Sequence, residues 1–260
     1  MTQVEYGYAD YTEYAATYEQ RPDYAPRAIE AALRTTGVVP GDPACDIGSG
    51  SAHLALPLLE YGLRVDAVEP TAAMREIGQR RTAGFGTVAW FDGLGERTGR
   101  PGDAYELVTF GSSFDRTDQP AALRETARLL RPGGHFLCCW NHRDFDDPLQ
   151  GAIEDLIASR IPGFRHGLRR VDPTKVIVAS GLFTEPVHIA STVVHEVDSA
   201  AWSAAWRSHK TLGDQAGEHF EEILDGIAAL VGEHAGDRVR VPYTTRMWVA
   251  KLREGTGDAR

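Results

Sequence analysis

Long apolar runs are missing from this sequence of 260 residues. No run approaches the roughly 20 consecutive apolar residues that a membrane helix needs. The polar, tyrosine-rich start MTQVEYGYADYTEYAATYEQ does not have the charged and apolar regions of a signal peptide. We therefore expect a globular, cytoplasmic protein without a membrane partner.

Cysteine is also scarce, and two of the 3 cysteines, Cys138 and Cys139, are adjacent within an apolar run. The third, Cys45, begins a short glycine-rich stretch. An odd number of cysteines in this arrangement predicts buried thiols rather than a disulfide framework.

Positive charge is in deficit, with a formal net charge of −10. Proteins that bind nucleic acids hold the phosphates with clustered lysine and arginine, so we expect no nucleic-acid partner. The densest basic stretch, FRHGLRRVDPTK (164–175), is interrupted and flanked by acids. We interpret it as a solvated loop.

Short apolar runs alternate with longer amphipathic segments from Pro43 to about Asn141, an order that predicts a parallel sheet covered by helices. Pro57 lies inside the helix expected at 52–61, so this helix should kink or start late. The expected strands are 44–48, 64–69, 87–92, 106–111, 134–140, 187–197 and 246–253. The other expected helices are 24–36, 72–83, 119–130, 147–160, 202–210 and 218–233.

The stretch CDIGSGSAH (45–53) joins the first strand to a helix, and Gly48 and Gly50 let a ligand approach its backbone. A dinucleotide fingerprint, G-x-G-x-x-G, requires glycine where this sequence has His53. Asp46 would repel a pyrophosphate but suits a positively charged ligand. Glu69, nineteen residues after Gly50 (69 − 50), is placed to accept ribose hydroxyls. Together these features predict S-adenosylmethionine.

Each of these two acids has a structural interpretation as well. Asp46 is also compatible with a cap at the helix N-terminus, and Glu69 with a solvated strand end.

Four motifs resemble those of the class I S-adenosylmethionine-dependent methyltransferases, in their small-molecule branch. They are Asp46 to Gly50, Glu69-Pro70, LRPGG (130–134) and YEQRPDY (18–24). The resemblance runs from about Tyr11 to Trp140. It implies an α/β Rossmann-like three-layer sandwich, with a seven-stranded, mostly parallel sheet whose last strand is antiparallel.

The resemblance also implies one methyltransferase domain built from four consecutive parts. Residues 1–36 would form an N-terminal lid arm and helix, and 43–141 the cofactor-binding core. Residues 142–212 would be an inserted acceptor-side segment, followed by a C-terminal helix and the last strand in 213–260.

The family's cofactor positions carry over residue by residue. Gly48 and Gly50 would line the methionine part, Asp46 would approach its ammonium, and Glu69 would bind the ribose. Other positions would lie beside the adenine (Asp92, Gly93), near the sulfonium (Gly111, Ser112), in the lid (Tyr18, Arg21) and elsewhere around the cofactor (Ser49, Pro70, Met74). Arg21 is a candidate for the methionine carboxylate. Ala52 stands where the family most often has glycine.

Methyl transfer needs mainly alignment and exclusion of water, with a general base where the acceptor must lose a proton. His142 is our candidate base because it follows the fifth strand at its carboxyl end, although a solvent-exposed loop histidine would give the same pattern. Asp115 and Tyr14 complete the predicted catalytic set. The remaining acceptor-side candidates are Arg116, Trp140, Asn141, Trp202, Trp206 and His209. The histidines lack metal-ligand spacing, so we predict no metal.

The sequence therefore predicts methyl transfer from S-adenosylmethionine to oxygen, nitrogen or carbon of a small acceptor. Aromatic and heteroaromatic compounds of specialised metabolism are among the acceptors we consider. A catalytically inactive cofactor-binding sensor or scaffold is the alternative, and a nicotinamide-dependent oxidoreductase is a weaker one. We expect a monomer or a homodimer.

Overall fold

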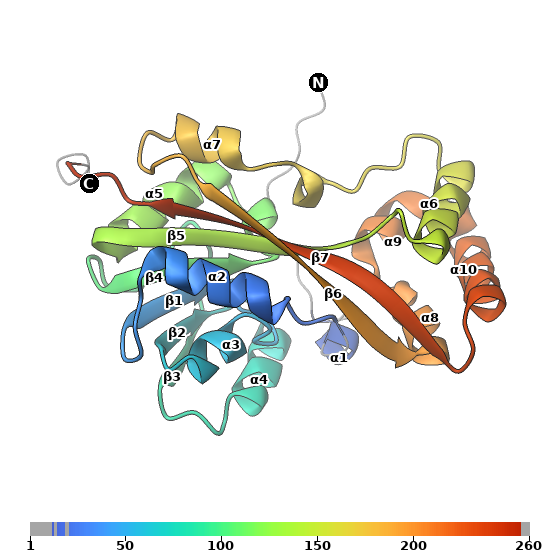
Figure 1. Cartoon of the computed structure of the whole chain (residues 1–260), viewed down its shortest axis with the longest axis horizontal. Helices are drawn as coiled ribbons and strands as arrows, with labels where there is room; N and C mark the ends of the chain where they lie inside the picture. Colours follow the sequence, from blue (N-terminus) through green and yellow to red (C-terminus); the bar gives the residue numbers. More distant parts are fainter. Residues whose placement is uncertain (1–11, 13–14, 19–20, 256–260) are drawn as a thin grey trace.

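The computed structural model describes residues 12, 15–18 and 21–255, which contain one seven-stranded sheet of order β3-β2-β1-β4-β5-β7-β6 (Figure 1). β7 is antiparallel to both of its neighbours, and the other pairs are parallel. This confirms the predicted fold. The strands are β1 (Pro43–Ile47), β2 (Arg64–Val68), β3 (Val88–Phe91), β4 (Tyr105–Gly111), β5 (Leu130–Arg143), β6 (Val187–Asp198) and β7 (Arg238–Lys251).

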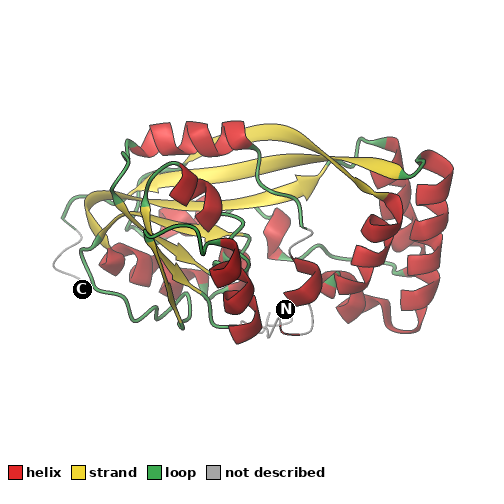
Figure 2. Cartoon of the chain, turned by 90° about the horizontal axis from the view of Figure 1, so that it is seen from below, coloured by secondary structure: helices red, strands yellow, loops and turns green. Residues whose placement is uncertain are grey.

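Helices cover both faces of the sheet, α2 and α3 on one and α5 and α7 on the other (Figure 2). Adjacent strand residues face opposite sides, so Cys138 and Cys139 are buried in different cores, and all the cysteines are free. The helices are α1 (Ala15–Tyr18), α2 (Pro26–Thr36), α3 (Ala55–Glu60), α4 (Ala72–Arg81), α5 (Gln119–Leu129), α6 (Pro148–Arg160), α7 (Thr174–Ala179), α8 (Ser199–Ala205), α9 (Lys210–Ala216) and α10 (Phe220–His234).

The late start expected at Pro57 is present. Helix α3 begins at Ala55, so Pro57 falls in its first turn, where a backbone N–H has no partner within the helix. Its missing N–H therefore costs the helix no hydrogen bond. The residues between β1 and α3 are left free to form an extended ligand-facing turn.

The last two strands are longer than the sheet beneath them. β7 pairs with β5 only from Tyr243 onward, whereas its first residues, from Arg238, pair with β6 alone. This two-stranded ribbon leads to helices α6, α8 and α10, which have their own apolar core (Figure 1). The apolar pattern of the sequence predicts this strand only at 246–253, because Pro242 and the polar residues around it interrupt that pattern.

No helix in the part of the chain that the structure describes is both long enough and apolar enough to span a membrane.

Candidate active site

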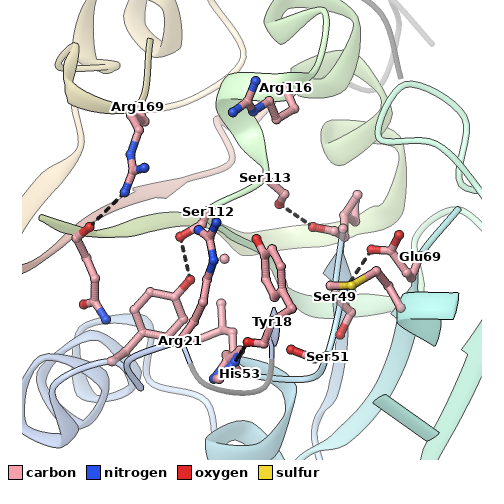
Figure 3. Close-up of a pocket in the computed structure, with 18 of the residues that line it drawn as sticks. Tyr18, Arg21, Ser49, Ser51, His53, Glu69, Ser112, Ser113, Arg116 and Arg169 are labelled. Atoms are coloured by element: carbon pink, nitrogen blue, oxygen red, sulfur yellow. Dashed lines mark hydrogen bonds between the residues drawn. The ribbon is translucent and has the colours of Figure 1, made fainter. Parts of the chain in front are cut away.

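A cavity of about 610 Å³ opens at the carboxyl ends of β1, β2 and β4 and extends under the ribbon. Small-molecule sites generally have volumes of roughly 300–1,000 Å³. We call the part lined by residues 18–121 the donor half. The acceptor half is the part lined by residues 141–243. Side chains from distant parts of the chain meet there (Figure 3).

Two glycines shape the turn after β1. Gly48 and Gly50 have φ values of +65° and +54°. A Cβ on Gly48 would lie 2.5 Å from the Cβ of Ser113, whose hydroxyl donates to the Ile47 carbonyl at 2.6 Å. A Cβ on Gly50 would lie 3.2 Å from the methyl group of Met74. The turn therefore has room for glycine at these positions and leaves backbone groups facing the cavity.

Glu69 braces this turn from the end of β2. Its carboxylate accepts the N–H of Gly50 at 2.9 Å and the N–H of Thr71 at 2.8 Å. The side chain is almost fully buried, and burial raises its pKa. A carboxylate has about four acceptor positions, so lone pairs remain for ligand hydroxyls.

Asp46 lies under the turn and is completely buried. Ser49 donates to one of its oxygens at 2.6 Å and Thr109 to the other at 2.7 Å. Burial raises its pKa from 3.8 to about 6, against the effect of these two hydrogen bonds. A cation in the cavity would favour the ionised form and lower this pKa.

Most of the other predicted cofactor positions also line the cavity: Pro70, Met74, Gly93, Gly111, Ser112, Tyr18 and Arg21. Asp92 differs, because its side chain is 74% exposed and lies 3.9 Å from the Arg75 guanidinium. β3 ends at Phe91, so Asp92 already belongs to the loop and Gly93 is the residue that reaches the cavity. We therefore correct the expected position of Asp92.

The N-terminal arm is held at the mouth of the cavity by His53. One ring nitrogen, Nδ1, is 2.8 Å from the carboxylate of Asp23, and the other, Nε2, is 3.1 Å from the carbonyl of Tyr18. The Arg21 guanidinium stacks over the Tyr18 ring at 4.3 Å. The residue that breaks the dinucleotide fingerprint thus connects the glycine turn to the arm (Figure 3).

Comparison with known proteins agrees with the methyltransferase resemblance noted in the sequence. Residues 45–138 match a family model described as "Methyltransferase domain". The chain is 34% identical over 128 residues to the uncharacterized methyltransferase Rv3342 of Mycobacterium tuberculosis, covering 49% of this chain and 50% of that protein. It thus spans about half the length of that relative. Residues 45–138 are thus similar to methyltransferase domains.

Two further similarities extend over more of the chain. It is 26% identical over 218 residues to demethylmenaquinone methyltransferase of Mycobacterium bovis (strain BCG), covering 82% of this chain and 80% of that one. The solved YcgJ protein of Bacillus subtilis has a TM-score of 0.56 at 18% identity, covering 89% of this chain and all of that one. The second similarity shows the shared fold.

His142 does not face the cavity, contrary to the expectation from sequence. Its neighbours on β5, Asn141 and Arg143, line the cavity, so His142 points to the opposite face. There its Nε2 lies 2.8 Å from the Arg169 carbonyl, and burial lowers its pKa from 6.5 to about 4. We therefore correct its predicted role as a base at the acceptor: His142 supports the segment that bears Arg169.

Asp115 also lies apart from the main cavity, beside a void of about 30 Å³. Its carboxylate accepts the indole N–H of Trp140 at 2.8 Å and is 3.5 Å from the Arg116 guanidinium. These contacts explain its position as an internal ion-pair partner rather than a group facing the acceptor. Tyr14, the third predicted catalytic residue, lies outside the described residues.

The acceptor half contains residues that the sequence analysis identified and others that it missed. Asn141, Trp202, Trp206 and His209 line the acceptor half, as expected of acceptor-side candidates, whereas Arg116 lines the donor half. The lining residues with polar or charged side chains that were missed are Arg143, His166, Arg169, Arg170, His195 and Tyr243. Three of them belong to the stretch 164–175, so its interpretation as a solvated loop is also corrected. The close spacing of basic residues was the available signal.

Within the described ranges, no group of three or more His, Cys, Asp or Glu side chains has the arrangement of a metal site.

Proposed function

We propose that this protein transfers the methyl group of S-adenosylmethionine to oxygen, nitrogen or carbon of a small-molecule acceptor. Aromatic and heteroaromatic compounds of specialised metabolism are the acceptors we consider first. One observation carries the proposal: the glycine turn with its two buried acids opens into the same cavity as the aromatic side chains of the acceptor half. Donor and acceptor can therefore meet without a path through solvent.

The donor half fits S-adenosylmethionine, because a glycine turn and the two buried acids Asp46 and Glu69 line the same part of the cavity. When bound, this cofactor supplies a methyl group on a positively charged sulfur. We propose that Gly48 and Gly50 approach its amino-acid part, with Asp46 near the ammonium. The remaining lone pairs of Glu69 would accept from the ribose hydroxyls.

Other residues of the donor half complete the proposed binding site. Tyr18 and Arg21 would cover the ligand from the arm, with Arg21 next to its carboxylate. Gly93 would adjoin the adenine. Ser49, Pro70, Met74, Gly111 and Ser112 would fill the remaining wall.

The protein's part in the reaction is to align the acceptor with the methyl group and to exclude water, which can contribute several kcal/mol to lowering the barrier. A proton acceptor is needed only for some acceptors. In place of His142 we propose His195, which lines the cavity. Its Nε2 is 3.1 Å from the Asp23 carbonyl, an arrangement in which Nε2 holds the proton and Nδ1 can accept one.

Calorimetric titration with S-adenosylmethionine, S-adenosylhomocysteine and NAD, each added separately, tests the proposal. We expect both sulfur compounds to bind with one site per chain and NAD not to bind. Tight NAD binding with no response to either sulfur compound would refute it. Methyl transfer to a panel of phenols, indoles, amines and carboxylic acids then separates an enzyme from a cofactor-binding scaffold.

A further inference from the structure

Charge is divided sharply between the two halves of the cavity. The acidic residues that line it are Asp46, Glu69, Glu96 and Asp118, all in the donor half. Apart from Arg21 and Arg116, the arginines that line it are Arg143, Arg169 and Arg170, in the acceptor half. A chain with a net charge of −10 thus directs a positive cluster into its own active site.

Two of these arginines have no carboxylate partner among the described residues. Arg169 donates to the Asn141 carbonyl at 3.4 Å, and Arg170 to the Arg143 carbonyl at 3.1 Å. The acid near Arg169, Asp115, is already bound by Trp140 and Arg116. Arg143, by contrast, pairs with Glu154 at 2.5 Å. Arg169 and Arg170 therefore direct guanidinium N–H groups toward the cavity without a carboxylate beside them to balance their positive charge. Figure 3 shows Arg169 in this position.

This arrangement has an electrostatic cost. Burial and neighbouring guanidinium groups lower the pKa of Arg169 and lower that of Arg170 from 12.5 to about 10. Both side chains are still cations near neutral pH. Positive charges held together and partly removed from water are stabilised when an anion binds between them, and guanidinium groups match the planar oxygens of carboxylate and phosphate.

Apolar rings and a neutral donor surround the arginines. Trp202, Trp206 and Tyr243 line the cavity, and His209 stacks on Trp206 at 5.1 Å with ring planes 20° apart. Burial and the nearby arginines hold the pKa of His209 well below its usual value, so the ring is neutral. Its Nδ1 accepts the Leu212 N–H at 3.3 Å, which leaves the proton on Nε2.

We infer that the methyl acceptor carries an anionic group, a carboxylate or a phosphate monoester, on a small apolar body, and that Arg169 and Arg170 bind this group. The inference rests on the proposed function, because the anion would occupy the cavity beside the methyl donor. The donor's own carboxylate is the competing ligand for these two arginines, and the experiment must separate the two.

The test measures binding of three matched probes to the full chain by calorimetry at pH 7.5, with and without saturating S-adenosylhomocysteine. The probes are phenylacetate, phenyl phosphate and the neutral phenylacetamide. We expect at least one anion to bind about tenfold more tightly than the amide. Binding of only one of the two anions identifies the source of the negative charge.

Arg169→Gln and Arg170→Gln should each weaken anion binding about tenfold and leave the affinity for S-adenosylhomocysteine within about twofold. Arg169→Lys keeps the charge without the fork of N–H groups and should retain part of the anion affinity. The control is Arg165→Gln, which removes an exposed arginine of the same segment that does not line the cavity. Thermal unfolding confirms that each variant is folded.

Three results overturn the inference: neither anion binds more tightly than phenylacetamide, anion affinity is unchanged in both glutamine variants, or these variants lose affinity for S-adenosylhomocysteine to the same extent. The last result assigns the arginines to the donor's carboxylate. Failure of the proposed function looks different, because wild-type protein then gives no signal with S-adenosylhomocysteine alone.

Discussion

The two halves of the cavity are built in different ways. The donor half comes from consecutive strand ends of the sheet, and its acids are held by short hydrogen bonds from the turn itself, as between Gly50 and Glu69. The acceptor half is assembled from β5, the ribbon and the segment containing Arg169, which are far apart in the sequence. One half is therefore determined by local geometry and the other by tertiary packing. Substitutions should affect them separately.

The largest effect is expected from Gly48→Ala. The new Cβ would meet Ser113 at 2.5 Å, and φ is +65°, so the turn must move as well as bear strain of about 1–2 kcal/mol. We expect at least about a hundredfold loss of S-adenosylmethionine affinity, measured by calorimetry. Gly37→Ala is the matched control, because Gly37 has φ +72° with nothing within 4 Å of the new Cβ. A similar loss of S-adenosylmethionine affinity in both variants would show that the geometry of the turn at Gly48 is not the cause.

Glu69→Ala should have the next largest effect. It removes the acceptor for the N–H groups of Gly50 and Thr71, and hydrogen bonds to charged groups contribute about 1.5–3 kcal/mol. We expect donor affinity to fall about thirtyfold, while the affinity for an acceptor-half anion changes little. Glu60→Ala, at an exposed position, serves as the control. Equal weakening of both ligands would contradict the separation of the two halves.

Asp46 should make donor binding pH-dependent. Its pKa of about 6 in the folded protein lies above the usual 3.8, so the folded state binds a proton more readily than the unfolded state. This stabilises the fold below about pH 4, and the contribution is lost as pH rises to about 6. A cationic ligand favours the ionised form, so donor affinity should rise several-fold between pH 5 and 7. The Asp46→Asn variant should lack that rise; an identical profile in it would assign the dependence to another group.

His142→Gln should have the smallest effect on catalysis. Glutamine can still donate to the Arg169 carbonyl, and the side chain points away from the cavity, so turnover should stay within about twofold of wild type. The variant should differ in acid stability. The lowered pKa of His142, about 4, means that the wild type loses up to about 3 kcal/mol as pH falls from 6.5 to 4. Thermal unfolding at several pH values measures this difference, and a large loss of turnover would return His142 to the active site.

The contrast between the halves also explains what the sequence could predict. Asp46 lies near the end of β1, and Gly48 and Glu69 directly follow β1 and β2, so strand order alone brings them together. The late start of α3 followed from one proline. Short-range rules were sufficient for the donor half and for the order of the sheet.

The acceptor half lies beyond such rules. His142 and Asn141 are adjacent, and which of them faces the cavity depends on the register of β5, since a shift by one residue exchanges the two faces. Arg169 and Arg170 lie in a stretch that looks like solvated loop, and only packing against β5 and the ribbon turns them inward. The position of Asp92 also depends on where a strand ends. The sequence predicts a strand through Asp92, but β3 ends at Phe91, which leaves the Asp92 side chain exposed.

The ribbon of β6 and β7 has a geometric consequence. It projects past β5 and links Trp202 of α8 to the sheet, so under the proposed function its length sets the distance between acceptor and donor. Each residue adds about 3.3 Å along a strand. Because side chains alternate between the two faces, inserting two residues in β6 and two in β7 keeps the inward-facing residues inward. Such an insertion would move the far wall outward by about 7 Å without touching Gly48 or Glu69. Under the proposed function, the lengths of β6 and β7 therefore determine how large an acceptor the cavity can hold.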